Sequence, residues 1–275
     1  LRKKSSSVNT IPKMTSIYST KEKADKSVEN IFETGFENGV FSVGDTNYRI
    51  KVGELDTDGD VWKIKTAESS EWQKTVASHT AMTFGDIGKV RVGIKTTADK
   101  VFVRKDWQSP KPELLKPLVT HDDARRFKSF RPNYSVLYTH EVKNGKKCAI
   151  DISQYPIAEK FLLENKEILE SRTYIKKAKR NWYEIWVPQQ PENWKKTKLV
   201  FPDISEKPIF WISSDDEVIQ GNCYWIISDK NEEDLLWLAL GVGNSSFIEE
   251  FYDVNFNNKL YAGRRRFMTD RKSVV

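Results

Sequence analysis

The sequence predicts an α+β protein with mixed sheets, a few helices and a β-rich first half. The 275 residues are 38% hydrophobic and 12% aromatic and include nine Trp, which is enough apolar material to bury a core. Short segments in which apolar and polar residues alternate dominate positions 40–104. Longer segments with apolar residues at helical spacing occur after position 156. The length suits one large domain or two modest ones.

The first half is predicted to consist mainly of strands. Alternation of apolar and polar residues carries this prediction, and Asp58-Gly59-Asp60 supplies a turn before the third strand. Residues 110–120, which contain three Leu, predict a short helix or a turn. The expected strands are residues 40–43, 48–52, 61–64, 87–94, 101–103 and 134–140.

The second half is predicted to mix helices and strands. The clearest helix begins at Pro156, which suits a first helical turn, and its apolar residues recur at helical spacing. A second helix has acids in its first turn and Gly241 at its end. The expected elements are helices over residues 156–171, 232–240 and 247–252, and strands over residues 198–201, 208–212 and 223–227.

The first 35 residues are rich in Ser, Thr, Lys and Asn, so residues 1–35 predict a linker or a loosely packed arm. Residues 36–275 are expected to form one domain with two lobes that divide near 150–180. The sequence opens Leu1-Arg2-Lys3-Lys4 without an initiator Met, so we expect it to start inside a longer parent protein. Its longest uncharged stretch, residues 235–248, is too short to cross a bilayer, and we expect a cytoplasmic location.

The net charge of +6 conceals an uneven distribution. Residues 171–198 carry eight basic and two acidic residues, and residues 259–272 carry six basic residues and one acid. Between these windows, residues 203–253 hold twelve acids and two lysines. Basic windows interleaved with aromatic residues suggest one side that faces a polyanion and one solvated side. A basic run can equally be a surface that only keeps the protein soluble.

The sequence carries no recognisable catalytic or metal-binding motif. Its three His are widely spaced, and Cys148 and Cys223 can form neither a disulfide framework nor a four-ligand metal site. It has no Walker-type loop and no Gly-x-Ser-x-Gly elbow, and the lone Gly-x-Gly at 241–243 follows a helix, which is the wrong context for a dinucleotide site. We therefore expect no catalytic residue, no metal and no cofactor in this chain.

Several segments from residue 92 onward resemble, in their order, those of one known family. The segments are residues 92–103 (VGIKTTADKVFV), 114–118 (LLKPL), 180–186 (RNWYEIW), 198–205 (KLVFPDIS), 208–210 (PIF) and 235–240 (LLWLAL), then Asn244-Ser245 and Phe251-Tyr252. Together they are similar to the TaqI-like C-terminal specificity domain of adenine-N6 DNA methyltransferases. The resemblance spans residues 88–266. Thr97 departs from it, because the family's pattern has Gly at this position.

The resemblance implies a DNA target recognition domain of a restriction-modification or phage-defence methyltransferase. The family's catalytic domain holds the adenine with an Asn/Asp-Pro-Pro-Tyr/Phe loop, and this sequence has no Pro-Pro. The implied partners are double-stranded DNA and a separate methyltransferase domain, with S-adenosylmethionine bound in the parent enzyme and not in this chain. Two other classes stay open, namely a protein-interaction or regulatory domain of such a system and a nuclease of unrecognised type.

Recognition of duplex DNA needs cations for the phosphates and side chains that reach base edges. Arg180 and Asn181 are residue types that read guanine and adenine bidentately in the major groove. Trp182 suits either stacking or burial, and the polar loop at 95–100 either touches phosphate or simply turns the chain. The candidate DNA-binding residues are Lys95, Thr96, Lys100, Arg125, Arg126, Lys176, Lys177, Lys179, Arg180, Asn181, Trp182, Lys195, Lys196, Arg264, Arg265 and Arg266.

Overall fold

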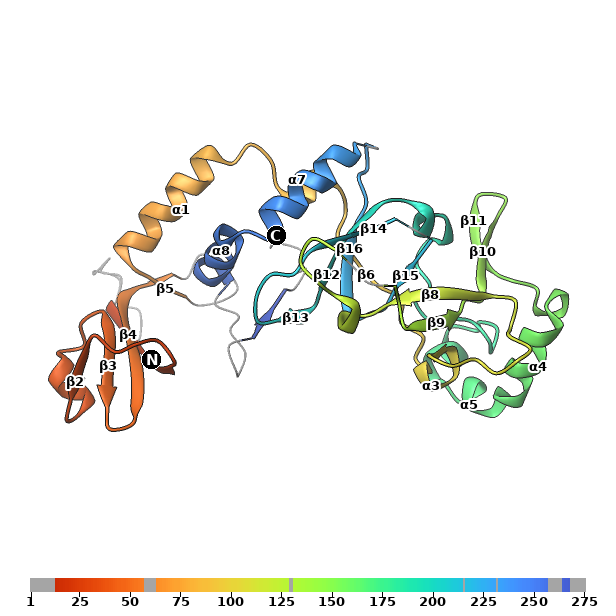
Figure 1. The fold of residues 1–275 in the computed structure, drawn as a ribbon, viewed down its shortest axis with the longest axis horizontal. Coiled ribbons are helices and arrows are strands. Elements are labelled where there is room, and N and C mark those ends of the chain that lie inside the picture. Colours follow the sequence, from red (N-terminus) through yellow and green to blue (C-terminus); the bar gives the residue numbers. More distant parts are fainter. Residues whose placement is uncertain are drawn as a thin grey trace, which may run out of the picture. The chain divides into compact units, whose positions relative to one another are not determined.

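The computed structural model describes residues 13–56, 63–128, 131–214, 216–230, 232–256 and 264–267. Within them the fold is α+β, as the sequence predicts (Figure 1). The chain forms two compact units, residues 1–81 and 82–275, each described here by itself. The predicted division near 150–180 is not where the units separate. Strand β15 (Val218–Ile219) pairs with β8 (Leu115–Val119), so segments on both sides of that position share a sheet.

The first unit is built on one mostly antiparallel sheet with strand order β1-β4-β3-β2, and β5 pairs with β4. Val28, Val40 and Ile50 supply its buried apolar side chains. Its elements are β1 (Lys13–Thr20), β2 (Lys26–Val28), the 3₁₀ helix η1 (Ile31–Thr34), β3 (Gly39–Val43), β4 (Thr46–Asp56), β5 (Lys63–Lys65) and α1 (Ala67–His79). Helix α1 was not expected, because its apolar residues are too few to mark a helical stripe.

Residues 13–34 are not the linker that their composition predicts, because they form β1, β2 and η1. β1 pairs with β4 along its whole length, and its half-buried positions are Ser16, Tyr18 and Thr20. Backbone hydrogen bonds, rather than apolar anchors, therefore hold this edge strand. Residues 1–12 of the predicted linker and the predicted turn at 58–60 lie outside the described residues.

The second unit contains two four-stranded sheets, ordered β14-β12-β16-β6 and β15-β8-β9-β7, and the two-stranded ribbons β10-β11 and β13-β17. Its other elements, in chain order, are α2 (Phe84–Ile87), β6 (Arg91–Val92), α3 (Asp99–Phe102), β7 (Val103–Arg104), η2 (His121–Asp123), β9 (Tyr134–Leu137), β10 (His140–Lys143), β11 (Lys146–Ala149), η3 (Ile152–Gln154), α4 (Pro156–Glu164), α5 (Lys166–Glu170), α6 (Thr173–Lys177), η4 (Pro191–Lys195), β12 (Lys198–Pro202), β13 (Ile204–Ser205), β14 (Trp211–Ser213), β16 (Cys223–Ile226), α7 (Glu233–Gly243), α8 (Ser246–Phe256) and β17 (Arg265–Arg266).

Strand β12 lies between two apolar clusters of the second unit. Because side chains alternate across a strand, Val200 faces one cluster and Leu199 and Phe201 face the other. The first cluster contains Trp194 and Trp225, whose rings lie 5.1 Å apart, and joins the two sheets. The second cluster forms under α7 and α8. All five residues of β12 are buried, which agrees with its nearly continuous apolar sequence.

Three predicted elements in the first half of the chain differ from the structure. Residues 115–119 form strand β8 and not a helix or turn, since Pro117 is unsuited to a helix interior and Leu118 is fully buried in the sheet. Residues 87–94 pair as a strand only at Arg91–Val92, and Asp99–Phe102 is helical. The backbone crosses another segment at Gly93, where an added Cβ would lie 2.1 Å from the carbonyl oxygen of Gln220.

The helices predicted in the second half are present. The helix expected over 156–171 is interrupted at Asn165, which divides it into α4 and α5. Helix α7 continues through Gly241 to Gly243, where a Cβ would lie 2.8 Å from the Phe210 ring. The buried Asn244 amide then bonds both the backbone N–H and the carbonyl of Phe210, at 2.9 Å each. None of the helices in the described part of the chain is long and apolar enough to cross a membrane.

Candidate nucleic-acid interface

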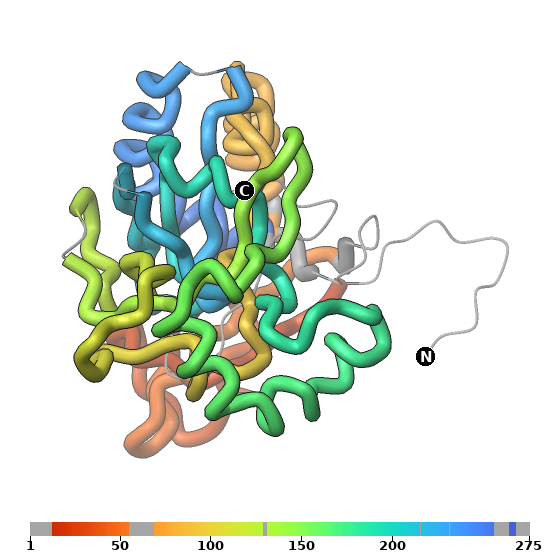
Figure 2. The backbone as a smooth tube through the Cα atoms, turned by 90° about the vertical axis from the view of Figure 1, so that its right-hand side faces the viewer, coloured from red at the N-terminus to blue at the C-terminus, as the bar shows by residue number. Residues whose placement is uncertain are grey.

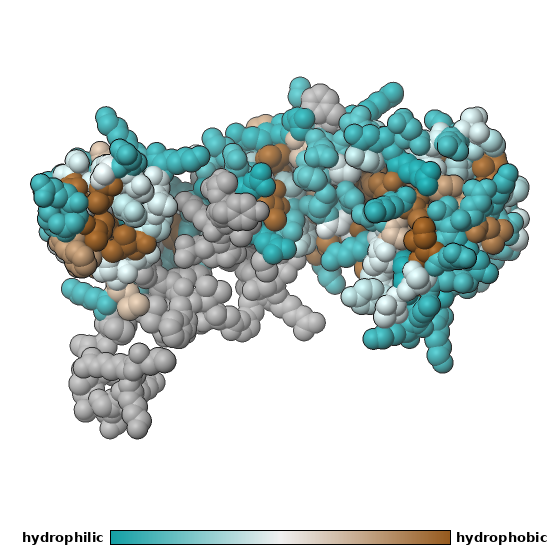
Figure 3. Space-filling model, turned by 90° about the horizontal axis from the view of Figure 1, so that it is seen from below, coloured by the Kyte–Doolittle hydropathy of each residue, from teal (hydrophilic) through white to brown (hydrophobic). Residues whose placement is uncertain are grey.

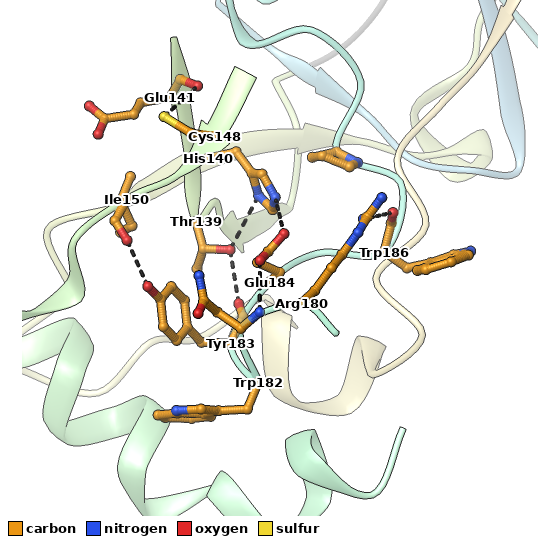
Figure 4. Close-up of polar contacts among 12 residues, drawn as sticks. Thr139, His140, Glu141, Cys148, Ile150, Arg180, Trp182, Tyr183, Glu184 and Trp186 are labelled. Atoms are coloured by element: carbon orange, nitrogen blue, oxygen red, sulfur yellow. Dashed lines mark hydrogen bonds and ion pairs between the residues drawn. The ribbon is translucent and has the colours of Figure 1, made fainter. Parts of the chain in front are cut away.

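Residues 180–187 form a loop with a buried inner side and an exposed outer side (Figure 4). On the inner side, Ile185 is fully buried and the Tyr183 hydroxyl donates to the carbonyl of Ile150 at 2.9 Å. A tight turn is closed by the backbone N–H of Asn181, which donates to the Glu184 carboxylate at 2.8 Å. Arg180 and Asn181 are exposed on the outer side. Tyr183 and Ile185 therefore anchor the loop, while Arg180 and Asn181 are exposed to solvent.

Arg172 ties this loop to two other segments. Its guanidinium donates to the carbonyls of Leu169 at 2.9 Å, Thr96 at 2.8 Å and Trp182 at 2.5 Å. The side chain is buried, and burial lowers the pKa of Arg172 to about 10, so it stays charged at neutral pH. One cation thus satisfies three carbonyls from distant parts of the chain, which makes it a positioning residue for the whole region.

The loop at 95–100 lies beside the 180–187 loop. Lys95 and Val187 exchange two backbone hydrogen bonds, of 3.0 and 2.9 Å. Lys95 and Lys100 are exposed, as a role in phosphate binding requires. Thr96 is different, because it is 2% exposed and its hydroxyl donates to Asp99. We therefore withdraw Thr96 as a DNA-binding residue, since its side chain is used to close the turn.

Thr97 stands where the pattern that the sequence resembles has Gly, and its backbone keeps the conformation that Gly favours. Its φ is 59°, in the left-handed region that β-branched residues rarely adopt. The carbonyl of the preceding Thr96 accepts a bond from Arg172 and one from the Thr97 hydroxyl. These bonds hold the turn in the left-handed form in spite of the side chain.

Replacing Thr97 by Gly is expected to stabilise the second unit by ~0.5–1 kcal/mol, because Gly adopts the left-handed conformation without steric cost. Thr97→Ala is the matched control, since it removes the branch but keeps the Cβ and should gain less. The midpoint of urea unfolding measures both variants. A lower midpoint for the Gly variant than for the wild type would show that the Thr97 backbone is not strained.

Helix α6 presents its lysines next to Arg180. Lys176 and Lys177 are exposed, and Lys179 has a φ of 53° at the position after the helix where Gly is favoured. The backbone N–H of Arg180 then donates to the carbonyl of Ile175 at 3.2 Å, which closes the helix end. Exposed cations therefore continue from the helix into the loop.

An aromatic stack supports the Arg180 guanidinium. The rings of Tyr174 and Trp186 lie 5.3 Å apart, and the guanidinium carbon lies 4.8 Å from the Trp186 ring centre. One guanidinium nitrogen also donates to the Trp186 carbonyl at 2.7 Å. Trp182 is half-buried, with the Lys166 ammonium 5.6 Å from its ring. Such surfaces suit contact with sugars, bases or phosphates.

His140 lies beneath the loop and contacts Glu184, with Nε2 and the carboxylate oxygen 3.4 Å apart. Burial lowers the pKa of His140 to about 3, and the nearby cations Lys147 and Arg180 act in the same direction. The imidazole is therefore neutral at physiological pH, and its role is to hold Glu184 and so the turn at Asn181. Within the described residues, no group of three or more His, Cys, Asp or Glu could hold a metal.

The remaining candidates do not all join this region. Lys195 and Lys196 are exposed at the end of η4, which packs against β10. Arg125 donates to nearby backbone carbonyls, and Arg126 donates to the carbonyl of Asn244, below α7. Both arginines are exposed, but the contacts with residues 210 and 244 place them at another part of the unit.

Arg265 is wrong as a DNA-binding candidate, because it is 7% exposed and its donors are used inside the protein. It pairs with Asp253 at 2.6 and 2.8 Å and with Glu249 at 3.0 Å. Arg266 is half-exposed near Asp203, with 3.5 Å between their charged groups, and Arg264 is exposed. A basic run in the sequence is therefore split by the strand alternation of β17 into buried and exposed cations.

Sequence reasoning missed a second group of lysines, Lys143, Lys146 and Lys147, on the hairpin of β10 and β11. Their signal was the dipeptide Asn144-Gly145 between two short apolar-polar segments, which is a strong hairpin signature. Figure 2 shows the hairpin and the segment from α4 to α6 on the same side of the second unit. On the face drawn in Figure 3, hydrophilic residues surround smaller hydrophobic patches.

Curated relatives of this chain are type II methyltransferases. The chain is 40% identical to M.BanIII of Aneurinibacillus aneurinilyticus over 271 residues, which covers 92% of this chain and 47% of that protein. It is 27% identical to M.BstVI of Geobacillus stearothermophilus, covering 75% and 36%, and 30% identical to M.MjaIV of Methanocaldococcus jannaschii, covering 62% and 58%. The chain is thus homologous to type II methyltransferases over 92% of its length and spans about half of the relative that it matches best among these.

A solved structure shares the fold. The type IIL restriction-modification enzyme MmeI, determined in complex with DNA, superposes with a TM-score of 0.50 and 12% identity. The match covers 84% of this chain and 29% of MmeI. No protein-family model matches the sequence.

Proposed function

We propose that this chain is the DNA target recognition part of an S-adenosylmethionine-dependent adenine-N6 methyltransferase of a restriction-modification or phage-defence system. In this proposal it binds double-stranded DNA sequence-specifically in the cytoplasm and contributes no catalytic residue. The observation that carries the proposal is homology to type II methyltransferases over 92% of the chain. The exposed cations at the 95–100 loop, α6 and the 180–187 loop supply the chemistry that DNA binding requires.

Each part of this region has a distinct role in the proposal. Lys95, Lys100 and the lysines of α6 neutralise phosphates and set the register of the protein on the duplex. Arg180 and Asn181 point outward from a loop that is fixed from behind, so they are the side chains placed to read base edges. Among the described residues, the Asn181 side-chain amide forms no hydrogen bond, so both its donor and its acceptor are open to adenine.

In this proposal a separate methyltransferase domain of the parent enzyme binds S-adenosylmethionine and the flipped adenine, and no step of methyl transfer is assigned to the residues of this chain. Within this chain, Gly88 and Gly93 serve close packing, because Cβ atoms there would meet carbonyl oxygens at 2.0 and 2.1 Å.

Binding to duplex DNA at increasing NaCl concentration tests the proposal. With about six exposed cations at the phosphates, the logarithm of the affinity should fall against the logarithm of salt with a slope near −5. Fluorescence anisotropy of a labelled 30-bp duplex gives the slope, and selection from a randomised duplex library gives the target sequence. Affinity that does not change with salt would overturn phosphate binding. Binding to a methyltransferase body without DNA affinity would favour a regulatory domain, and metal-dependent cleavage would favour a nuclease.

A further inference from the structure

The hairpin formed by β10 and β11 projects from the second unit as a two-stranded ribbon (Figure 1). The two strands pair from His140 opposite Ala149 to Lys143 opposite Lys146. Asn144 and Gly145 have φ values of 53° and 71°, as in the two-residue turn that matches the natural twist of a hairpin. The tip is therefore held in one shape before any ligand binds.

The tip concentrates positive charge, and Asp151 is close enough to interact electrostatically with Lys143. Lys143 and Lys146 are directly opposite each other, so the hairpin accepts a repulsion that an ordinary turn would avoid. Lys147 is also exposed, and among the described residues none of these three lysines forms an ion pair. The hairpin's one acid, Glu141, lies opposite Cys148, toward its base.

The Lys147 side of the ribbon faces Arg180. Lys147 lies opposite Val142 and so shares a face with His140, whose imidazole contacts Glu184 in the 180–187 loop. Burial and the charge of Arg180 lower the pKa of Lys147. The Glu184 carboxylate, which contacts His140 and accepts a hydrogen bond from the Asn181 N–H, adds one negative charge near His140. The cations Lys147 and Arg180 outnumber this carboxylate, so the surface between them can still bind an anion.

We propose that Lys143, Lys146 and Lys147 of the β10–β11 hairpin bind phosphodiester groups of double-stranded DNA beside Arg180, as a second arm of the interface. This proposal rests on the proposed function and deepens it. A two-stranded ribbon has the width that the major groove of B-form DNA admits, and DNA offers closely spaced phosphates along both walls. A lipid surface is disfavoured, because the tip sequence Lys-Asn-Gly-Lys-Lys has no apolar side chain to insert.

The test compares the full chain with the variant K143Q/K146Q/K147Q. Since the lysines lie on both faces of the ribbon, about two of the three can reach phosphates at once. The salt slope should become shallower by ~1.8, and the affinity for a 30-bp duplex should fall ~50-fold at 0.1 M NaCl. K89Q/K207Q/K230Q removes the same charge at exposed positions elsewhere and should change affinity less than ~3-fold.

Further measurements separate the outcomes. K143R/K146R/K147R keeps the charge and should retain most of the binding, and equal thermal midpoints for all variants show that the fold is intact. A hairpin variant that binds like the wild type would overturn the hairpin arm alone, with DNA binding of the chain preserved. A wild-type chain that binds no duplex DNA would overturn both proposals. Preference of the wild type for duplex RNA of equal length would overturn the assignment to DNA.

Discussion

Replacing Arg172 by Met is expected to destabilise the second unit by ~3–5 kcal/mol. The methionine fills similar space but leaves the carbonyls of Leu169, Thr96 and Trp182 without their buried donor. For a unit of this size the loss lowers the melting temperature by about 10 °C. DNA binding should weaken as well, because the loops at 95–100 and 180–187 lose the group that joins them. Thermal unfolding followed by circular dichroism, and anisotropy with duplex DNA, measure the two effects.

Arg131→Met is the matched control for this prediction, because Arg131 is exposed. Such a surface change normally alters stability by less than about 0.5 kcal/mol. Arg172→Lys keeps the charge, but a lysine ammonium cannot bond all three carbonyls as the planar guanidinium does. Its loss of stability should therefore lie between those of Arg172→Met and Arg131→Met. If Arg172→Met and Arg131→Met unfold at the same temperature, Arg172 does not hold the loops together.

Neutralising the lysines at the end of α6 and just after it, with K176Q/K177Q/K179Q, is expected to weaken duplex DNA binding on the order of 10²–10³-fold at 0.1 M NaCl. The three side chains are exposed on one short segment next to Arg180, so all three can contact phosphates together. The salt slope should become shallower by ~2.7. The loss should be the same for every DNA sequence, because phosphate contacts carry no sequence information.

Asn181→Ala distinguishes phosphate contacts from base reading in the same assay. It should leave the salt slope unchanged and reduce the preference for the selected sequence, since an amide that reads adenine contributes to discrimination and not to charge. K89Q/K207Q/K230Q serves again as the control for net charge. A loss in the α6 variant that varies with DNA sequence, or one matched by this control, would contradict the assignment of these lysines to phosphates.

The sequence predicted in part which residues of the candidate interface are exposed. The basic and polar residues at 176–181 are exposed, as the sequence predicts, because charged side chains in a helix end and a turn are rarely buried. Thr96 and Arg265 were wrong for a common reason: polar side chains at these positions satisfy buried groups of the protein. The hairpin lysines were missed because the basic windows were chosen by the number of charges in a long segment. The hairpin carries only three lysines, and strand pairing across Asn144-Gly145 brings them together.

The sequence by itself determined the α+β class, strand β12, helical structure within residues 156–171 and 232–240, and the strong positive charge near residue 180, because local periodicity and composition act over short distances. Only the tertiary structure decided which cations meet. The loops that carry Lys95 and Arg180 lie side by side because Val187 pairs with Lys95 and Arg172 bonds to both loops. These are contacts between residues up to about ninety positions apart, and no local pattern specifies them. Buried carbonyls need hydrogen-bond donors, so a basic residue close to them is buried to supply those bonds. The other basic residues stay exposed and available to a partner.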